Sequence, residues 1–483
     1  MQAIIILLTL VLSFGQARAE TLTVKFQPTD PGDRVSGNLI VVLSKTPFPP
    51  SGAGLLRVYA GEVRCLPNQT LGQGQTLTLE LKSGQRPLYA GAFLDQNRNF
   101  MASALAEPGE YYSSQVVALK GKDASLSLDR KRQPRVVKPP AWLQEHLIVS
   151  PLMLRAGFSV QQATQRFLVG LPPGYWTSGK RYPLLFVSHG FSGSRWANLD
   201  CYRIWREEMK LRPMILVSLE SNGDYGHHLF LNSEANGPRM RVLTEEVVPY
   251  IERRYRSQGQ RVVYGQSSGG WTAISLLRRA PPVFAGAVAT GPDPLTLQDW
   301  WMGPNQNLFT QPDGSPRMFA ESIGLTMRTL VDREVDTRSF GQFAAFLACF
   351  SRARPEQEPM PFQSPFDLVS GAFQPQVWAD WQDNDQSLWV QAHPDQARQN
   401  FANRLALFVG NRDEFGLYPT TLRFSHTLDR LKIPHRLRVI EGAGHTDYLD
   451  RPDFQRELYR TCFELSRSSL VESSAWEPAT VSR

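Results

Sequence analysis

The sequence has few cysteines. Only four occur in 483 residues, and none forms a C-x-x-C pair or lies at zinc-finger spacing from histidines. A metal site held by cysteines is therefore the least favoured interpretation. An oxidising compartment would permit disulfides, and the sequence does not rank the possible pairings. The four residues are Cys65, Cys201, Cys349 and Cys462.

Long hydrophobic runs are also missing. The apolar stretch IIILLTLVL at 4–12 is too short to span a bilayer, and no later run reaches transmembrane length. Ala17 and Ala19 match the small-residue rule for signal-peptide cleavage before Glu20. We therefore expect residues 1–19 to be a signal peptide and the mature chain to be exported, periplasmic or secreted, without stable membrane insertion. Because no basic residue precedes the apolar run, an uncleaved anchor stays open as an alternative.

Clustered charge of one sign is scarce as well. Lys and Arg number 52 against 45 Asp and Glu, a formal charge of +7, but basic residues gather only in DRKRQPRVVK at 129–138. We interpret this run as a solvated linker and expect no nucleic-acid partner. Neither G-x-G-x-x-G nor G-K-[ST] occurs, which argues against nucleotide binding. With 42% hydrophobic residues, the chain can build at least one full core.

Residues 20–137 predict a small β domain. Short alternating or β-branched runs such as LTVKF, GNLIVVLS and TLTLEL are separated by Gly, Pro and Asn, which is typical of an antiparallel sandwich. The stretch from Asp95 begins like a calcium loop, but Phe100 and Ala106 stand where Gly and the bidentate Glu are needed. We therefore predict a tight turn there and no metal site.

Residues 138–470 predict an α/β domain. From about residue 165, apolar strand-like runs alternate with amphipathic segments of helix length such as 241–256 and 422–433, the pattern of a mostly parallel sheet. The interval from about 291 to 400 is too long for one crossover, so we expect an inserted, largely helical cap. Residues 471–483 are expected to form a loose tail.

A G-x-S-x-G motif lies at the joint of a predicted strand and a predicted helix. It reads Gly265-Gln266-Ser267-Ser268-Gly269, and only Ser267 fits its central position. In this setting the small flanking residues let strand and helix approach closely, and the serine is held on a strained, exposed turn. We therefore predict Ser267 as a nucleophile. A glycine-rich helix start without chemistry is the alternative interpretation.

A serine hydroxyl needs a general base, and that base needs an acid to orient it. Asp413 follows the predicted strand LALFVG, and His445 follows the next one, RLRVI, in a glycine-rich loop. Both side chains would emerge at the same sheet edge as Ser267, in the chain order Ser, Asp, His. Glu414 is the alternative acid. The other histidines do not occupy such a position: His146, His189, His227, His228, His393, His426 and His435.

An oxyanion hole needs backbone N–H donors. Ser268, directly after the predicted nucleophile and at a helix start, is the first candidate, and Phe191, in the loop after the strand LLFVSH, is the second. His189 in the same loop is predicted to be a structural hydrogen-bonding residue. Tyr225 and Trp271 could line an aromatic pocket, although packing in the core explains Trp271 equally well.

Several of these segments together carry a family resemblance. They are RFLVGLPPGY, PLLFVSHGFSGS, VVYGQSSGGWTAISLLRRAPPVFAGAVATGPDP, LFVGNRDEFGLY and EGAGHTDY, within roughly residues 165–450. In this order they resemble the putative esterase family, which is related to esterase D and the enterochelin esterases. The resemblance implies an α/β-hydrolase fold with Ser267 as nucleophile, Asp413 as acid and His445 as base, acting without a cofactor. Gln266 is a departure, because many members have His there.

The function predicted from the sequence is a serine esterase that hydrolyses small-molecule or polymer-linked carboxylic esters through an acyl-enzyme. A prolyl-oligopeptidase-like peptidase would use the same chain order, but only about 115 residues precede the catalytic domain, too few for a propeller. A non-catalytic binding or envelope protein on a hydrolase scaffold is the second alternative. The sequence predicts neither the natural ester nor the oligomeric state.

Overall fold

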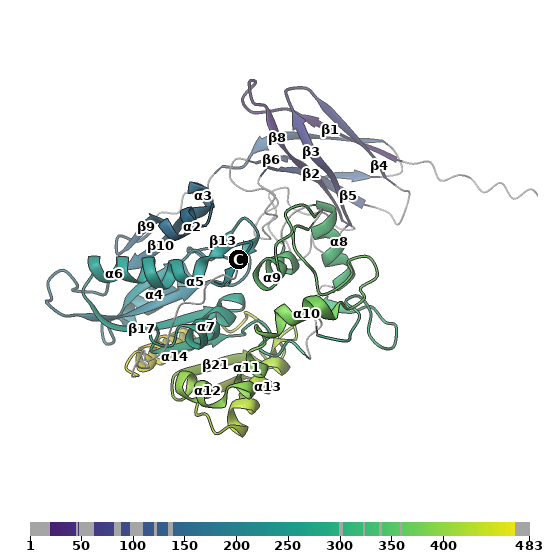
Figure 1. The fold of residues 1–483 in the computed structure, drawn as a ribbon. Coiled ribbons are helices and arrows are strands. Elements are labelled where there is room, and N and C mark those ends of the chain that lie inside the picture. The colour runs from purple at the N-terminus through teal and green to yellow at the C-terminus, as the bar shows by residue number, and fades with distance from the viewer. Residues whose placement is uncertain are drawn as a thin grey trace, which may run out of the picture.

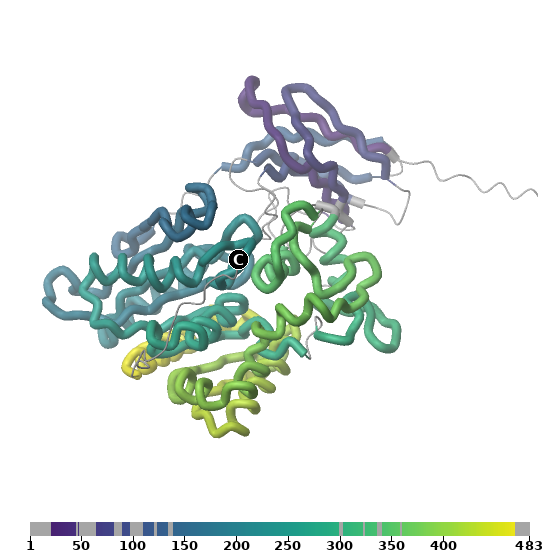
Figure 2. Tube along the Cα trace, in the orientation of Figure 1, coloured from purple at the N-terminus to yellow at the C-terminus, as the bar shows by residue number. Residues whose placement is uncertain are grey.

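The computed structural model places a small β domain beside a larger α/β domain that carries a mostly helical insertion (Figures 1 and 2). No helix of the described chain is long and apolar enough to cross a membrane. The predicted signal peptide and the predicted tail lie outside the described residues. Those residues are 20–44, 47, 62–81, 88–96, 110–119, 123–133, 139–298, 303–321, 324–337, 341–357 and 360–468.

The β domain is one curled sheet of eight described strands. Its order is β3-β2-β5-β6-β8-β1-β4, with β7 beside β5. The described strands pair antiparallel except β1 with β8, which run parallel and join the first strand to the last. This parallel pair differs from the purely antiparallel sandwich that the sequence suggested. The strands are β1 (Glu20–Phe26), β2 (Val35–Ser44), β3 (Glu62–Leu71), β4 (Thr76–Leu81), β5 (Leu88–Asp95), β6 (Tyr111–Ser113), β7 (Val117–Leu119) and β8 (Ala124–Lys131).

Strand β2 is buried on both faces. Leu39 and Val41 point into the core of the β domain, together with Phe26. Ile40 and Val42, on the opposite face, belong to the buried cluster of the rest of the protein. Alternate residues of a strand point to opposite faces, so β2 separates the two cores. The β domain therefore packs against its neighbour through apolar side chains.

The α/β domain is built on a second sheet of eight described strands. Its order is β9-β10-β12-β11-β17-β18-β21-β22, and β10 alone runs antiparallel to both of its neighbours. This arrangement is the α/β-hydrolase fold, which confirms the fold class expected from the resemblance. The strands are β9 (Leu143–Val149), β10 (Thr164–Gly170), β11 (Tyr182–Ser188), β12 (Ile215–Leu219), β17 (Ser257–Gln266), β18 (Gly286–Thr290), β21 (Leu405–Gly410) and β22 (Arg436–Ile440).

Helices cover both faces of this sheet (Figure 1). In β11, Leu184 packs into the cluster on one face and Leu185 into the cluster on the other, which explains its unbroken apolar sequence. Helices α4 and α14 cover the face of Leu185, and α6, α7 and α13 cover the other. The helices are α2 (Pro151–Arg155), α3 (Val160–Ala163), α4 (Leu199–Glu208), α5 (Arg239–Arg241), the π-helix η1 (Val242–Val247), α6 (Val248–Arg254), α7 (Ser268–Arg279), α13 (Leu417–Arg430) and α14 (Pro452–Leu465).

Between β12 and α5 the chain forms two short hairpins. They pair β13 (Asn222–Gly223) with β14 (Gly226–His227), and β15 (Asn232–Ser233) with β16 (Gly237–Pro238).

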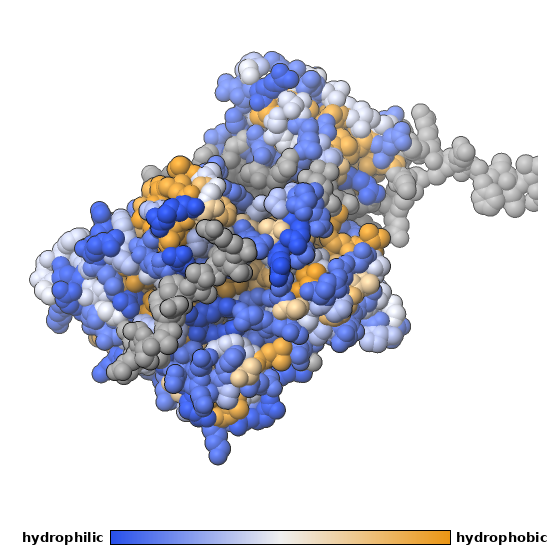
Figure 3. Space-filling model, in the orientation of Figure 1, coloured by the Kyte–Doolittle hydropathy of each residue, from blue (hydrophilic) through white to orange (hydrophobic). Residues whose placement is uncertain are grey.

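On the surface in Figure 3, hydrophobic side chains gather over α2 and α3, where Leu154 and Val160 are exposed.

The insertion lies between β18 and β21. It contains a small hairpin and five described helices, one of which, α9, is buried from Phe343 to Phe350. Its core includes Trp378 and Trp381, whose rings stack with centroids 5.9 Å apart. The elements are β19 (Met318–Ala320), β20 (Leu325–Thr326), α8 (Met327–Thr337), α9 (Gln342–Phe350), α10 (Pro375–Gln382), α11 (Gln386–Ala392) and α12 (Pro394–Phe401).

No disulfide joins the four cysteines in the structure. Cys349 and Cys462 are buried, while Cys65 and Cys201 are half-buried. The fold is therefore held by its hydrophobic cores rather than by disulfides.

Candidate active site

Ser267 lies on a sharp turn between β17 and α7. Its backbone has φ 57° and ψ −123°, a strained conformation for a residue with a side chain. A Cβ on Gly265 would lie 2.0 Å from the Gly269 carbonyl oxygen, and one on Gly269 would lie 2.2 Å from the Ser188 oxygen. The glycines of the motif are thus required by the close approach of strand, helix and neighbouring loop. This geometry exposes the Ser267 hydroxyl at the carboxyl edge of the sheet.

Asp413 and His445 meet at the same edge. Asp413 follows β21 and His445 follows β22, and the Asp413 Oδ2 atom accepts a hydrogen bond from His445 Nδ1 at 2.7 Å. The Asp413 side chain is fully buried. Glu414 instead accepts the backbone N–H of His445 at 2.9 Å, so Asp413 is the carboxylate that contacts the ring. Burial lowers the pKa of His445, but the hydrogen bond and charge of Asp413 outweigh it, and the pKa is raised above its usual value.

The Ser267 hydroxyl and the second ring nitrogen of His445 each contact another residue. Because His445 Nδ1 donates to a carboxylate, Nε2 is free to accept, and the side-chain amide of Gln266 donates to it at 3.1 Å. The Ser267 hydroxyl donates to Asp293 Oδ1 at 3.1 Å. No hydrogen bond joins Ser267 Oγ to His445 among the described residues.

A family model described as "Putative esterase" matches residues 161–460, more than half of the chain. The chain belongs to this esterase family. No curated protein matches it.

Solved structures that resemble this esterase cover about two thirds of its chain. A ferulic acid esterase has 16% identity, covers 67% of this chain and 97% of its own, and has a TM-score of 0.42. An S-formylglutathione hydrolase from Agrobacterium tumefaciens has 14% identity, covers 68% and 98%, and has a TM-score of 0.44. The fluorophosphonate-binding serine hydrolase F of Staphylococcus aureus has 16% identity, covers 68% and 100%, and has a TM-score of 0.42.

Asp293 is a site residue of the esterase that the sequence analysis missed. It follows β18 within the sequence GPDP and is 4% exposed. Besides Ser267, the Ser268 hydroxyl donates to Asp293 Oδ2 at 2.5 Å, and Gln342 Nε2 of the insertion lies 3.4 Å from the same oxygen. Burial raises the pKa of Asp293 to about 6. The rule that selected Asp413, a carboxylate just after a parallel strand, applies equally to Asp293 and would have found it.

The two predicted oxyanion donors belong to two segments that meet at Ser267, the start of α7 and the loop after β11. Ser268 is the first residue of α7, so its N–H has no acceptor within the helix and lies at the positive end of the helix dipole. Phe191 lies in the loop after β11, which passes directly beside Ser267: a Cβ on Gly190 would lie 3.2 Å from the Ser267 Cβ. In the described chain, the Phe191 N–H donates to no other backbone group.

His227 and His228 are both buried. Burial lowers the pKa of both, to about 3 for His227, so each is neutral. His227 accepts from the Leu229 N–H through Nδ1 at 3.1 Å and donates through Nε2 to the carbonyl of His189 at 2.9 Å. Trp271 is 1% exposed and packs against Phe350 of α9, which makes it a core residue.

Proposed function

We propose that this esterase hydrolyses carboxylic esters with Ser267 as nucleophile, His445 as general base and Asp413 as the acid that orients it. The observation that carries the proposal is the combination of a strained serine at a strand-to-helix turn with a 2.7 Å Asp413–His445 hydrogen bond at the same sheet edge. That hydrogen bond fixes the tautomer in which Nε2 can accept a proton. No cofactor is needed for this chemistry.

The reaction begins when the Ser267 hydroxyl turns from Asp293 to His445 Nε2. As His445 removes the proton, Ser267 Oγ attacks the ester carbonyl, and the N–H groups of Phe191 and Ser268 hold the oxyanion. His445 then gives the proton to the departing alcohol, which leaves the acyl group on Ser267. A water molecule, deprotonated by His445, then attacks this acyl-enzyme. As the bond between the acyl group and Ser267 Oγ breaks, His445 returns the proton to Oγ, which releases the carboxylic acid and regenerates the free serine.

The proposed substrate is a small-molecule or polymer-linked ester, and the proposed location is outside the cytoplasm. The latter rests on the apolar N-terminal stretch and the Ala17–Ala19 cleavage pattern. The proposed location is tested by expressing the full chain, assaying the exported fraction for the protein and sequencing the N-terminus of the mature form. We expect Glu20 as the first residue, and an N-terminus at Met1 would argue for a retained anchor.

The enzymatic proposal is tested with a p-nitrophenyl ester series and a fluorophosphonate probe. We expect Ser267→Ala to abolish probe labelling and to lower kcat by at least about 10³-fold, because the nucleophile is lost. Ser275→Ala is the matched control: Ser275 is buried in the middle of α7 and its hydroxyl has no hydrogen-bond partner among the described residues. Its activity should stay near that of the wild type.

Folded wild-type protein that neither turns over esters nor takes the probe would contradict the proposal. The non-catalytic binding protein would then become the better interpretation. Cleavage of prolyl peptides with no ester turnover would instead favour the peptidase alternative.

A further inference from the structure

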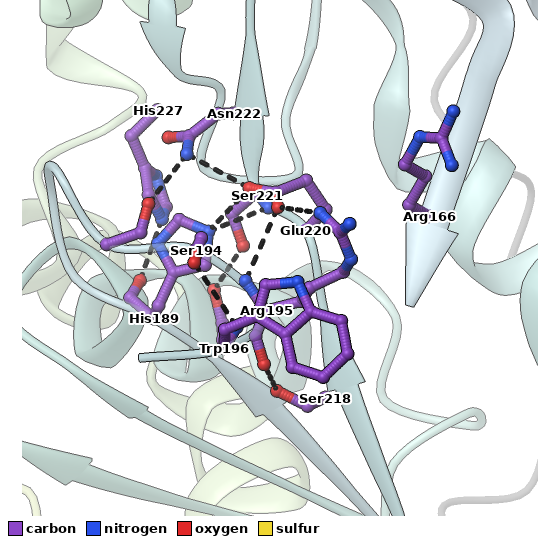
Figure 4. Close-up of polar contacts among 12 residues, drawn as sticks. Arg166, His189, Ser194, Arg195, Trp196, Ser218, Glu220, Ser221, Asn222 and His227 are labelled. Carbon is purple, nitrogen blue, oxygen red and sulfur yellow. Dashed lines mark hydrogen bonds and ion pairs between the residues drawn. The ribbon is translucent and has the colours of Figure 1, made fainter. Parts of the chain in front are cut away.

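The loop that carries Phe191 is held by the segment that follows β12. Asn222 Nδ2 donates to the Gly193 carbonyl at 2.8 Å, and His227 Nε2 donates to the His189 carbonyl at 2.9 Å. Figure 4 shows these side chains converging on the loop from the end of the neighbouring strand. The path of the loop is therefore fixed by side chains that take no part in the proposed chemistry.

The Gly190–Phe191 peptide bond has its carbonyl fixed at two points. The Gly190 oxygen accepts from His189 Nδ1 at 2.7 Å and from the Gly193 N–H at 3.1 Å. A carbonyl can only accept, so His189 Nδ1 carries a proton. In a trans peptide the N–H points opposite to the C=O. Holding the Gly190 carbonyl therefore sets the direction of the Phe191 N–H.

This peptide lies beside the proposed nucleophile. A Cβ on Gly190 would lie 3.2 Å from the Ser267 Cβ and 2.7 Å from Gln266 Oε1. Only a residue without a side chain allows the loop to come so close to the turn at Ser267. The N–H of the next residue, Phe191, is thus within reach of an oxyanion that forms on a carbonyl bonded to Ser267.

The His189 ring is itself fixed on its other nitrogen. Its Nε2 atom lies 3.1 Å from Glu220 Oε1 and 3.0 Å from the Ser221 nitrogen, and the residue is 2% exposed. A neutral ring accepts from the Ser221 N–H, and a protonated ring donates to Glu220. The Nδ1 proton is present in both forms, so the hydrogen bond to Gly190 does not depend on the charge of His189.

Glu220 is ionised in this network. Burial raises its pKa, but the hydrogen bond to His189 and the charges of His189 and Arg195 outweigh burial and lower the pKa to about 2. Arg195 Nη1 lies 3.0 Å from Glu220 Oε2, which gives the carboxylate a second fixed partner. Figure 4 shows Glu220 between Arg195 and His189. The carboxylate therefore ties the beginning and the end of the loop together.

We propose that His189 is a positioning residue that aims the Phe191 N–H at the oxyanion through its hydrogen bond to Gly190, with Glu220 holding the His189 ring. This inference rests on the esterase function proposed above. It assigns a role in the reaction to a histidine that the sequence analysis treated as structural.

The test compares His189→Asn with His189→Gln. The amide nitrogen of Asn can take the place of Nδ1, whereas that of Gln takes the place of Nε2. We expect His189→Asn to keep kcat within about tenfold of the wild type. We expect His189→Gln to lower kcat by about 10²-fold or more with little change in KM, as for the loss of one oxyanion donor. Glu220→Gln should fall between them.

A second readout separates an oxyanion effect from a general structural effect. Thionoesters develop charge on sulfur, a weaker hydrogen-bond acceptor than oxygen, so an intact oxyanion hole favours the ordinary ester. We expect His189→Gln to reduce the ester-to-thionoester rate ratio and His189→Asn to preserve it. The control pair is His146→Asn and His146→Gln, because His146 is hydrogen-bonded to Tyr250 and Tyr255 away from the site. Neither control should change the ratio.

The possible outcomes distinguish this inference from the proposed function. Equal kcat values and equal rate ratios for His189→Asn and His189→Gln, with normal Ser267-dependent turnover in the wild type, would overturn the role of His189 alone. A rise in KM without a fall in kcat would do the same. Wild-type protein without Ser267-dependent turnover would overturn both.

Discussion

Replacing Asp293 by Asn should stabilise the protein at neutral pH. The carboxyl group is buried, and burial raises its pKa from 3.8 to about 6. A departure of one pH unit between folded and unfolded pKa values is worth about 1.4 kcal/mol, so ionisation of Asp293 costs up to about 3 kcal/mol of folding free energy. The Asp293 carboxyl ionises at a lower pH in the unfolded chain than in the folded protein. The cost is therefore absent below pH 3.8, grows as the pH rises to about 6, and is constant above that pH.

Asp293→Asn removes this ionisation but keeps a side chain of the same shape. We expect its free energy of unfolding to equal or fall below that of the wild type at pH 4, and to exceed it by about 1 to 3 kcal/mol at pH 7 and 8. Urea unfolding followed by tryptophan fluorescence at five pH values between 4 and 8 measures the difference. A difference that does not change with pH would refute the reasoning, because loss of hydrogen bonds alone is nearly independent of pH.

The same substitution should change the pH dependence of activity. The charge of Asp293 contributes to the raised pKa of His445, after the larger effects of burial and Asp413. Without that charge the pKa of His445 falls, so the acid limb of the kcat/KM profile should move to lower pH. Asp385→Asn is the control: Asp385 is also fully buried, its pKa is also raised by burial, and it caps α11 in the insertion. It should leave the acid limb in place.

Three further predictions concern stability and the thiols. Gly265→Ala would place a Cβ 2.0 Å from a backbone oxygen of α7 and should destabilise the protein by about 3 kcal/mol or more in urea unfolding, whereas Gly179→Ala, which meets nothing within 4 Å, should be nearly neutral. Glu334→Gln removes a carboxyl group whose pKa is raised by burial from 4.5 to about 8. The unfolding free energy of the variant relative to the wild type should therefore rise between pH 4.5 and 8, by up to about 5 kcal/mol. A difference between the two proteins that does not change with pH would contradict this. Denatured protein that has not been treated with a reductant should show four thiols that react with Ellman's reagent, and fewer would reveal a disulfide. In the native protein Cys349 and Cys462 should not react, because both are buried.

The parts of the site that follow from local rules could be predicted from the sequence. Ser267 is marked by glycines at fixed spacing, and the structure shows the backbone contacts that require them. Asp413 and His445 follow apolar strands, and a parallel sheet brings such positions to one edge. Short apolar runs locate these strands along the chain. The ends of the strands then suffice to predict that Asp413 and His445 lie at this edge.

The parts that depend on distant contacts could not be predicted in the same way. Gln342 reaches Asp293 and Ser268 from the start of α9, 74 residues beyond Ser268, and nothing in the local pattern points to that contact. The parallel pairing of β1 with β8 joins Leu22 to Ala124 and likewise has no local signal. Alternation along a strand shows which face is buried, but it does not show which partner strand lies beside it.

The insertion contributes to the site through a helix end that is itself held by a buried carboxyl group, that of Glu334. Glu334 of α8 accepts the N–H groups of Phe343 and Ala344 at 3.1 and 2.7 Å, and so satisfies donors at the start of α9 that have no partner within the helix. This fixes the position of Gln342, the first residue of α9, beside Asp293. Both carboxyl groups are costly to ionise in these surroundings. Because Gln342 contacts Asp293 and Asp293 accepts the Ser267 hydroxyl, Glu334 is linked to Ser267 by one connected path of contacts that begins in the insertion.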